Sequence, residues 1–513
     1  MKNYLLAILS GILFSISWPI DGFIFFIFFG FVPLLFLAEK LINSNSSIKF
    51  FSYSYVSFII FNIYTTSWIY YASPFGAISA ILANSFFMAL VMMLYFYSKK
   101  ALKKRLSYFS LIVFWLTFEY IHLNWDLSWP WLTLGNSFSE SLYLINWYEY
   151  TGVLGGSFWI ILLNILFFEF FRTRNFTKIY SILFVLIVPI LISNLISKQD
   201  ANLSSGKLNV VIVQPNVDPY KEKFSLSFTE QLNDFIVLAK TKLDSNTNLL
   251  VGPETALQEA IWESKVNYAE SIIELKKLQL EFPKLNILLG ASTYKLFKKE
   301  EERSATARQF RNEDLWYDIY NSAIYLSNSG DISIYHKTKL VPGAEKIPFP
   351  RLFNSFSALS VDLGGVSGSL GSQNSIESFK VSDFNLLPLI CYESIYGDLN
   401  SNKVSNVLCI ITNDGWWRDT KGYKQHFSYA KLRAIEQKRS IIRSANTGIS
   451  AFISPNGDVS NVAGWDEQKV IKSQVETYNT VTFYNQYGDY IGRISSFISS
   501  IFIFMIFVKS KIN

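Results

Sequence analysis

The chain has 513 residues, of which 50% are hydrophobic and 17% aromatic, and its formal net charge is +6. A chain of this length is longer than one hydrophobic core usually organises, so we expect more than one folded unit. The charge is modest and lies largely in a few short loops. Because no nucleic-acid-binding motif accompanies it, we exclude nucleic acid as a partner.

The first two hundred residues consist of apolar runs separated by short loops. A membrane-spanning helix needs about 20 mostly apolar residues, and eight runs approach this length. They are residues 4–20, 23–37, 51–70, 78–97, 106–121, 157–171, 179–196 and 491–508. The sequence thus predicts an α-helical polytopic membrane domain with seven transmembrane helices in residues 1–197. A C-terminal transmembrane helix is predicted in residues 489–508.

Lys and Arg fall in alternate loops of this predicted membrane domain. "KKALKKR" (99–105), "RTRNFTK" (172–178) and the C-terminal tail are basic, whereas the intervening short loops, including 122–156, have no Lys or Arg. Cytoplasmic loops of membrane proteins carry the excess of Lys and Arg. We therefore expect cytoplasmic termini and an extracytoplasmic globular domain at 207–481.

Two alternatives concern the membrane part. The first run follows Lys2 and would also suit a cleaved signal peptide, although no small-x-small cleavage site stands out. The spans would also suit a plain anchor, but seven exceed what anchoring needs, which favours a role toward lipid or substrate. The Trp- and Tyr-rich loop 122–156 is typical of the bilayer interface and is a candidate route for a lipid.

Residues 207–481 alternate short β-branched runs with helical or loop segments. The strand candidates are "LNVVIVQPNV", "NLLVGPET", "NILLGAS", "NSAIYLS", "ISIYHK", "NLLPLICYES", "NVLCIITND" and "SIIRSANTGISAFISPNG". The helix candidates are "FTEQLNDFIVLAKTKL" and "YAESIIELKKLQLEF". This alternation predicts an α/β domain with a largely buried sheet. Reactive residues of such sheets tend to lie just past the carboxyl ends of strands.

Three strand candidates are followed by chemically active residues, namely Glu254, Lys337 and Cys391. A free thiol is mostly protonated at neutral pH, so a nucleophilic Cys391 needs a base, which Glu254 can be. Lys337 can supply positive charge to the oxyanion of acyl transfer. From the residues alone, surface ion pairs for Glu254 and Lys337 and a disulfide between Cys391 and Cys409 stay open. Cys409, inside an apolar run, is typical of a core residue.

The motifs "GPET", "YHKTKLVP", "CYES", "TNDGWW" and "RSANTGISAFISPNG" resemble, in order and spacing, those of the nitrilase (carbon-nitrogen hydrolase) superfamily. With the predicted spans, the chain resembles its membrane branch, the apolipoprotein N-acyltransferases. The resemblance implies an αββα sandwich and a catalytic triad of Glu254, Lys337 and Cys391. It also implies supporting or substrate-binding roles for Glu345 and Glu393, with no cofactor and no metal. "PGAE" (342–345) stands where the family usually has Pro-Phe-Gly-Glu.

The implied reaction moves a fatty acyl chain from a phospholipid to the cysteine as a thioester. The chain then passes to the α-amino group of the diacylglyceryl-cysteine of an apolipoprotein. The resemblance further implies a multi-pass protein of the bacterial inner membrane whose catalytic domain faces the periplasm. The partners would be the phospholipid donor, the apolipoprotein acceptor and the lipid bilayer.

Two segments of the predicted α/β domain stand out by their composition. Residues 349–375 are rich in Gly and Ser but also contain Phe and Leu. They would suit a flexible surface loop, but their place between the lysine and cysteine motifs favours a mobile lid that meets the membrane. Residues 298–314 are expected to form a solvated hairpin or helix.

The alternative enzyme is a membrane-tethered nitrilase-like amidase or hydrolase with water as acceptor, but a soluble substrate gives no reason for seven spans. A transporter or scaffold with a degenerate domain is disfavoured by the intact Glu254, Lys337 and Cys391.

Overall fold

A computed structural model describes residues 2–44, 46–197, 204–221, 225–297, 303–310, 314–349 and 369–512. The chain divides into two compact units. One is helical and comprises Met1–Ala201 with Thr482–Asn513, and the other is an α/β unit, Asn202–Val481. The predicted lid lies mostly, and the predicted charged hairpin in large part, outside the described residues.

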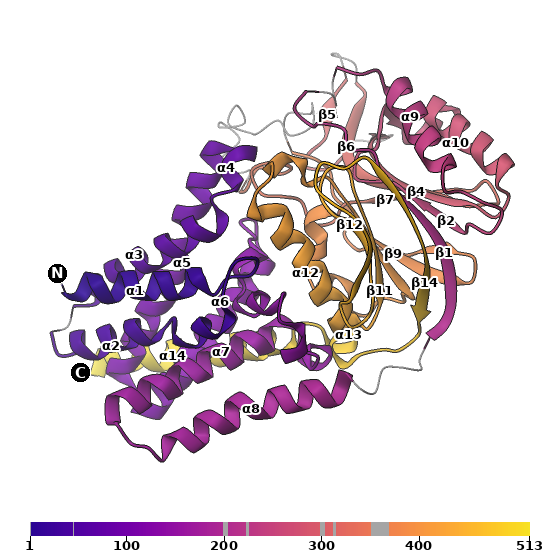
Figure 1. The fold of residues 1–513 in the computed structure, drawn as a ribbon. Helices are drawn as coiled ribbons and strands as arrows, with labels where there is room; N and C mark the ends of the chain where they lie inside the picture. The colour runs from indigo at the N-terminus through magenta and orange to yellow at the C-terminus, as the bar shows by residue number, and fades with distance from the viewer. Residues whose placement is uncertain are drawn as a thin grey trace. The chain divides into compact units, whose positions relative to one another are not determined.

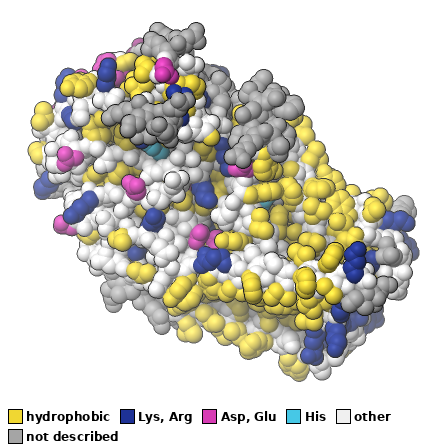
Figure 2. All heavy atoms as spheres, turned by 180° about the vertical axis from the view of Figure 1, so that it is seen from behind, with side chains coloured by type: hydrophobic (Ala, Val, Ile, Leu, Met, Phe, Trp, Pro, Cys, Tyr) yellow, Lys and Arg dark blue, Asp and Glu magenta, His cyan; other side chains and the backbone are white. Residues whose placement is uncertain are grey.

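A helix covers part or most of each of the eight predicted spans in the helical unit (Figure 1). The unit contains α1 (Lys2–Ile16), η1 (Ile24–Phe29), α2 (Val32–Leu41), α3 (Ser47–Thr66), α4 (Ile69–Ala72), α5 (Pro74–Ala101), α6 (Lys104–Leu123), α7 (Tyr148–Thr173), α8 (Lys178–Ser197), α13 (Phe483–Tyr487) and α14 (Tyr490–Ile512). Figure 2 shows hydrophobic side chains gathered over these helices, with Lys and Arg clustered at one end of the unit.

Six of the described spans are long and apolar enough to cross a membrane: Ile24–Leu41, α5, α6, α7, α8 and α14. Of the other two predicted spans, α1 is shorter, and α3 has 20 residues but includes four Ser, three Tyr and two Thr side chains. The structure thus supports a membrane domain, while the count of seven spans before the α/β unit stays a prediction. The aromatic loop between α6 and α7 folds inward in part, because Trp131 and Phe138 are buried.

The described residues of the α/β unit form two sheets. The first has eight strands in the order β14-β1-β2-β4-β6-β5, with β3 on β4 and β7 on β6. The second has six in the order β13-β12-β11-β10-β9-β8. The first-sheet strands are β1 (Ser204–Gln214), β2 (Leu249–Val251), β3 (Leu257–Trp262), β4 (Asn286–Phe297), β5 (Arg308–Gln309), β6 (Trp316–Leu326), β7 (Ile332–His336) and β14 (Lys469–Tyr478). The second-sheet strands are β8 (Phe379–Val381), β9 (Phe384–Ile390), β10 (Val407–Thr412), β11 (Ser440–Ala445), β12 (Ser450–Ile453) and β13 (Val459–Ala463).

The two sheets pack face to face, and helices cover their outer faces (Figure 1). Val210 and Ile212 of β1 enter the core between the sheets, whereas Val211 and Val213 pack against α9 (Phe228–Lys240) and α10 (Glu270–Glu281). This alternation follows from the two-residue side-chain period of a strand. On the second sheet lies α12 (Lys421–Gln437), which contributes Ala430 and Ala434 to the packing. The αββα sandwich implied by the motifs is thus confirmed.

Candidate active site

The three residues predicted at strand ends all lie at the carboxyl ends of short strands, of which β2 and β9 are largely buried and β7 is half-exposed. Glu254 comes three residues after β2, Lys337 directly follows β7, and Cys391 directly follows β9. All three side chains are buried or nearly so, at 8%, 1% and 9% exposure of the residue. The structure therefore keeps these polar groups out of bulk water, where they must find partners within the protein.

Lys337 forms ion pairs with two carboxylates. Its Nζ donates to Glu345 Oε1 at 2.8 Å and to Glu254 Oε1 at 3.3 Å. Asn321 Nδ2 donates to the same two oxygens, at 2.9 Å for Glu345 and 2.7 Å for Glu254. The remaining oxygens accept backbone N–H groups, Glu254 Oε2 from Asn413 at 3.1 Å and Glu345 Oε2 from Val341 at 2.8 Å. The chain has Gly-Ala before Glu345 where the family usually has Phe-Gly, and the carboxylate of Glu345 nevertheless contacts Lys337.

The ammonium of Lys337 stays charged despite its burial. Burial by itself lowers the pKa of a lysine, but here the carboxylates of Glu345 and Glu254 outweigh it and hold the pKa of Lys337 above its ordinary value. A fixed positive charge in a water-poor site is the kind of group that stabilises a developing oxyanion.

Cys391 sits at a sharp turn where β9 passes into a 3₁₀ helix, η8 (Cys391–Ile395). Its φ of 51° lies in the left-handed region, which is uncommon for a residue other than glycine and concentrates at functional sites. Burial raises the pKa of the Cys391 thiol well above its ordinary value; the charge of Glu254 adds to this and Lys337 opposes it. The thiol is therefore protonated at neutral pH and needs a base to act as a nucleophile.

Glu393 ties the turn at Cys391 to the segment that carries Lys337. Its buried Oε1 accepts hydrogen bonds from Tyr335 OH, Thr338 N and Thr338 Oγ1, each at 2.6 Å, and Oε2 accepts from Ile390 N at 2.8 Å. Burial raises the pKa of Glu393, and these hydrogen bonds oppose that rise. The carboxylate of Glu393 thus links residues beside Lys337 to the turn at Cys391. Its supporting role stays a prediction.

Three buried residues that we did not single out from the sequence lie beside Cys391: Asp414, His426 and Arg443. Asp414 accepts from Arg443 Nη2 at 2.8 Å and pairs with His426 Nδ1 at 2.9 Å. On its other side, His426 Nε2 lies 3.1 Å from the carbonyl oxygen of Cys391 and 2.9 Å from Ser394 Oγ. Burial raises the pKa of Asp414, but Arg443 and His426 outweigh it, so the pKa lies below its ordinary range.

The sulfur of Cys391, a carboxylate oxygen of Asp414 and a ring nitrogen of His426 lie within 4.8 Å of one another. Such a set resembles a metal site by residue type. However, both ring nitrogens of His426 are engaged in hydrogen bonds, and Arg443 already supplies a positive charge to Asp414. The arrangement is therefore a hydrogen-bond network around the turn at Cys391.

Cys409 lies within β10, fully buried in the core between the sheets, and both cysteines are free. This placement agrees with a core role for Cys409, and the disulfide considered from the sequence is not formed.

Comparison with known proteins covers both units. Residues 10–166 match the family model "Apolipoprotein N-acyltransferase N-terminal domain", and residues 210–482 match "Carbon-nitrogen hydrolase". The chain is 27% identical to the apolipoprotein N-acyltransferase of Chlorobaculum tepidum over 99% of this chain and 97% of the relative. It is also 27% identical to those of Thermotoga maritima, over 100% and 95%, and Aquifex aeolicus, over 89% and 95%.

The carbon-nitrogen hydrolase match alone spans more than half of the chain, and the second model accounts for most of the helical unit. The chain therefore belongs to the carbon-nitrogen hydrolase superfamily and, within it, to the apolipoprotein N-acyltransferase family of membrane enzymes.

Proposed function

We propose that this protein transfers a fatty acyl chain from a phospholipid to the α-amino group of diacylglyceryl-cysteine at the N-terminus of apolipoproteins. The observation that carries the proposal is the buried cluster of Glu254, Lys337 and Cys391, held in a chain that is similar to an apolipoprotein N-acyltransferase over 99% of its length. A carboxylate, an ammonium and a thiol so arranged suit acyl transfer through a covalent intermediate.

In the first half-reaction, Cys391 Sγ attacks the carbonyl carbon of the phospholipid ester while Glu254 takes the thiol proton. The ammonium of Lys337 stabilises the oxyanion. The intermediate then collapses, the ester C–O bond breaks, and the proton on Glu254 passes to the departing lysophospholipid. This sequence leaves a thioester on Cys391 and a Glu254 carboxylate ready to act again.

In the second half-reaction, the amino group of the acceptor attacks the thioester carbonyl. Glu254 removes a proton from the attacking nitrogen and returns it to the sulfur as the C–S bond breaks. An amide forms and the free thiol is restored. Because Glu345 and Glu393 contact Lys337 or its neighbours, we assign them supporting roles rather than proton transfer.

A membrane-tethered amidase would use the same three residues with water as the acceptor. The helical unit favours the acyltransferase, because a lipid donor explains several membrane-spanning helices and a soluble amide does not. For the same reason we assign the phospholipid and the lipoprotein precursor as the substrates.

The fate of the acyl-enzyme distinguishes the acyltransferase from the hydrolase. Incubation with phospholipid alone should add one fatty acyl mass to the intact protein and release lysophospholipid, and a diacylglyceryl peptide should then discharge it. Cys391→Ala should form no adduct, while Cys409→Ala, the matched control, should form it normally. Rapid loss of the adduct to water, with no transfer to peptide, would point to a hydrolase instead.

For topology we assign both termini to the cytoplasm and residues 207–481 to the periplasm, in the bacterial inner membrane, from the alternation of basic loops. An impermeant thiol reagent tests this in a Cys391→Ala, Cys409→Ala background. Asp458→Cys, on the exposed surface of the α/β unit, should be labelled in spheroplasts, and Lys103→Cys only after lysis. The reverse pattern would overturn the assignment.

A further inference from the structure

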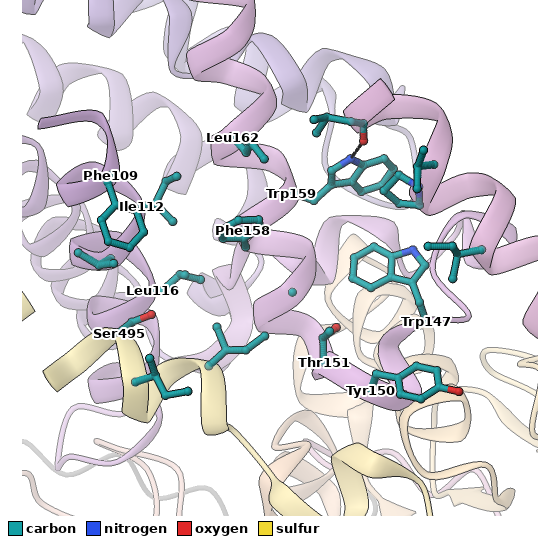
Figure 3. Close-up of a pocket in the computed structure, with 18 of the residues that line it drawn as sticks. Phe109, Ile112, Leu116, Trp147, Tyr150, Thr151, Phe158, Trp159, Leu162 and Ser495 are labelled. Atoms are coloured by element: carbon teal, nitrogen blue, oxygen red, sulfur yellow. Dashed lines mark hydrogen bonds between the residues drawn. The ribbon is translucent and has the colours of Figure 1, made fainter. Parts of the chain in front are cut away.

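An apolar groove of about 630 Å³ lies wholly within the helical unit, lined by residues of α6, α7, α8 and α14 (Figure 3). In Figure 3, Phe109, Ile112 and Leu116 of α6 lie on one side, and Trp147 and Trp159 lie on the other. Its volume falls in the range of ~300–1,000 Å³ that is usual for ligand sites. Its lining residues all belong to the helical unit, whereas Cys391 belongs to the α/β unit.

Three polar side chains of the groove wall are bonded within the protein. Trp159 Nε1 donates to the carbonyl of Val185 at 2.7 Å, and Trp147 Nε1 donates to that of Leu144 at 2.8 Å. Thr151 Oγ1 donates to the carbonyl of Gly152 at 3.0 Å. With these donors occupied, the wall offers an incoming molecule mainly apolar contact, which suits a hydrocarbon and neither water nor a polar ligand.

A proline in α8 explains why the carbonyl of Val185 is free to accept the hydrogen bond from Trp159. Pro189 lies four residues after Val185 and has no N–H, so the carbonyl of Val185 lacks its usual partner within the helix. The indole of Trp159, on α7, takes that place. The bond joins α7 to α8 beside the groove and fixes a wall that would otherwise hold an unpaired carbonyl in an apolar setting.

The medium outside the groove is membrane hydrocarbon. All four helices are long and apolar enough to cross a membrane, and α8 and α14 are only 17% and 22% buried along their apolar windows. The lining residues Phe184 and Ile494 are 67% and 55% exposed. The groove is therefore open to the acyl chains around the protein, which are the molecules that can fill it.

The length of the groove is close to the thickness of the hydrocarbon layer of one membrane leaflet. On α8 its residues run from Phe184 to Ile192, about 12 Å at 1.5 Å per residue, whereas half of the hydrocarbon core is ~15 Å thick. Trp147 and Tyr150, at the start of α7, belong to the lining and are residue types that favour the headgroup level. An acyl chain whose headgroup lies near this pair would run along the groove toward Leu162.

We propose that this groove is a binding site for one acyl chain of a phospholipid from the surrounding bilayer. The proposal rests on residues of the helical unit alone and does not depend on the transfer reaction at Cys391. Its occupant fills a space that the four helices leave between them, and so stabilises the packing of α8, which the described contacts tie chiefly to α7.

The test uses a diether phosphatidylethanolamine, which has hydrocarbon chains but no ester to donate an acyl group. The full-length protein is purified in detergent with this lipid and examined by native mass spectrometry. We expect the indole of Val188→Trp to fill the groove and to exclude one lipid per chain. The fraction of chains that carry this lipid should fall about tenfold, because the larger side chain overpacks the site. Ile187→Trp, on the neighbouring lipid-exposed position outside the lining, should retain the wild-type number.

A second pair on α14 guards against misfolding of one variant. Ile494→Trp lies in the lining and should also lose the lipid, whereas Ile501→Trp, comparably exposed but outside it, should not. Equal lipid numbers in lining and control variants, or a lipid-free dimer in which a second copy covers the groove, would overturn the proposal. Because the probe cannot acylate Cys391, neither result bears on the acyltransferase assignment.

Discussion

The imidazole Nε2 of His426 lies 3.1 Å from the backbone carbonyl oxygen of Cys391. A carbonyl oxygen only accepts hydrogen bonds, so in the tautomer with a proton on Nε2 His426 donates to the peptide of the proposed nucleophile, and Ser394 Oγ donates to the same oxygen at 2.7 Å. Because Asp414 and Arg443 hold the other side of the ring, the contact fixes the left-handed turn that presents the thiol. We assign His426 a positioning role.

His426→Ala should slow formation of the acyl-enzyme by about 10- to 100-fold, because small misplacements of reacting groups cost rates of this order. His426→Gln, whose amide can still donate to the carbonyl of Cys391, should restore part of the rate. Single-turnover acylation, read beside thermal unfolding, measures both. If Gln and Ala variants are equally slow while both fold normally, the hydrogen bond to Cys391 does not position the nucleophile.

Lys337→Ala should lower the acylation rate by about 10²–10³-fold, the usual loss when an oxyanion-stabilising donor is removed. Lys339→Ala is the matched control, two residues along the same segment. Its ammonium lies 5.1 Å from the ring centre of Tyr396 rather than on the Glu254–Glu345 pair, so its rate should change little. Single-turnover acylation that ranks the two variants the other way would remove Lys337 from the proposed mechanism.

The three strand-end residues were predictable because each polar group follows a strand that is apolar or β-branched, a pattern visible in sequence. Asn321 was not, because it lies in the middle of β6, where a strand residue looks like any other. His426 was missed for a different reason. Its helix α12 buries Lys431, Arg433 and Glu436, so a polar sequence, which usually indicates surface, hides a buried element.

The prediction of strands from the sequence was limited in a similar way. "SIIRSANTGISAFISPNG" was read as one strand candidate, but the chain turns near Gly448, whose φ is 150°, and forms antiparallel β11 and β12. The strands β3, β8, β13 and β14 were not predicted at all. Short or half-exposed strands of this kind are stabilised by pairing with neighbours, which a local pattern does not reveal.

The pKa of the Cys391 thiol should respond in opposite directions to its two charged neighbours. Glu254→Gln removes a negative charge that raises this pKa, so alkylation by iodoacetamide should reach its half-maximal rate at lower pH. Lys337→Met removes a positive charge that lowers it, so the midpoint should move to higher pH. Rates are measured in a Cys409→Ala background. Shifts of the same sign in both variants would contradict the charge arrangement described above.

Gly290, on β4, permits the close approach of the segment that carries Glu254. A Cβ at this position would lie 2.6 Å from Glu254 Cα and 2.4 Å from Thr255 N, and these are backbone atoms that cannot rotate away. Gly290→Ala should therefore displace Glu254 and slow acylation by up to about 10²-fold, the cost of a misplacement near 1 Å.

Gly464→Ala, where the nearest atom is the flexible end of Glu467 at 3.3 Å, is the control for this prediction. Since the base is displaced and not removed, the pH dependence of alkylation should shift less in Gly290→Ala than in Glu254→Gln. A Gly290→Ala protein that acylates at the wild-type rate would show that the position of Glu254 is not critical.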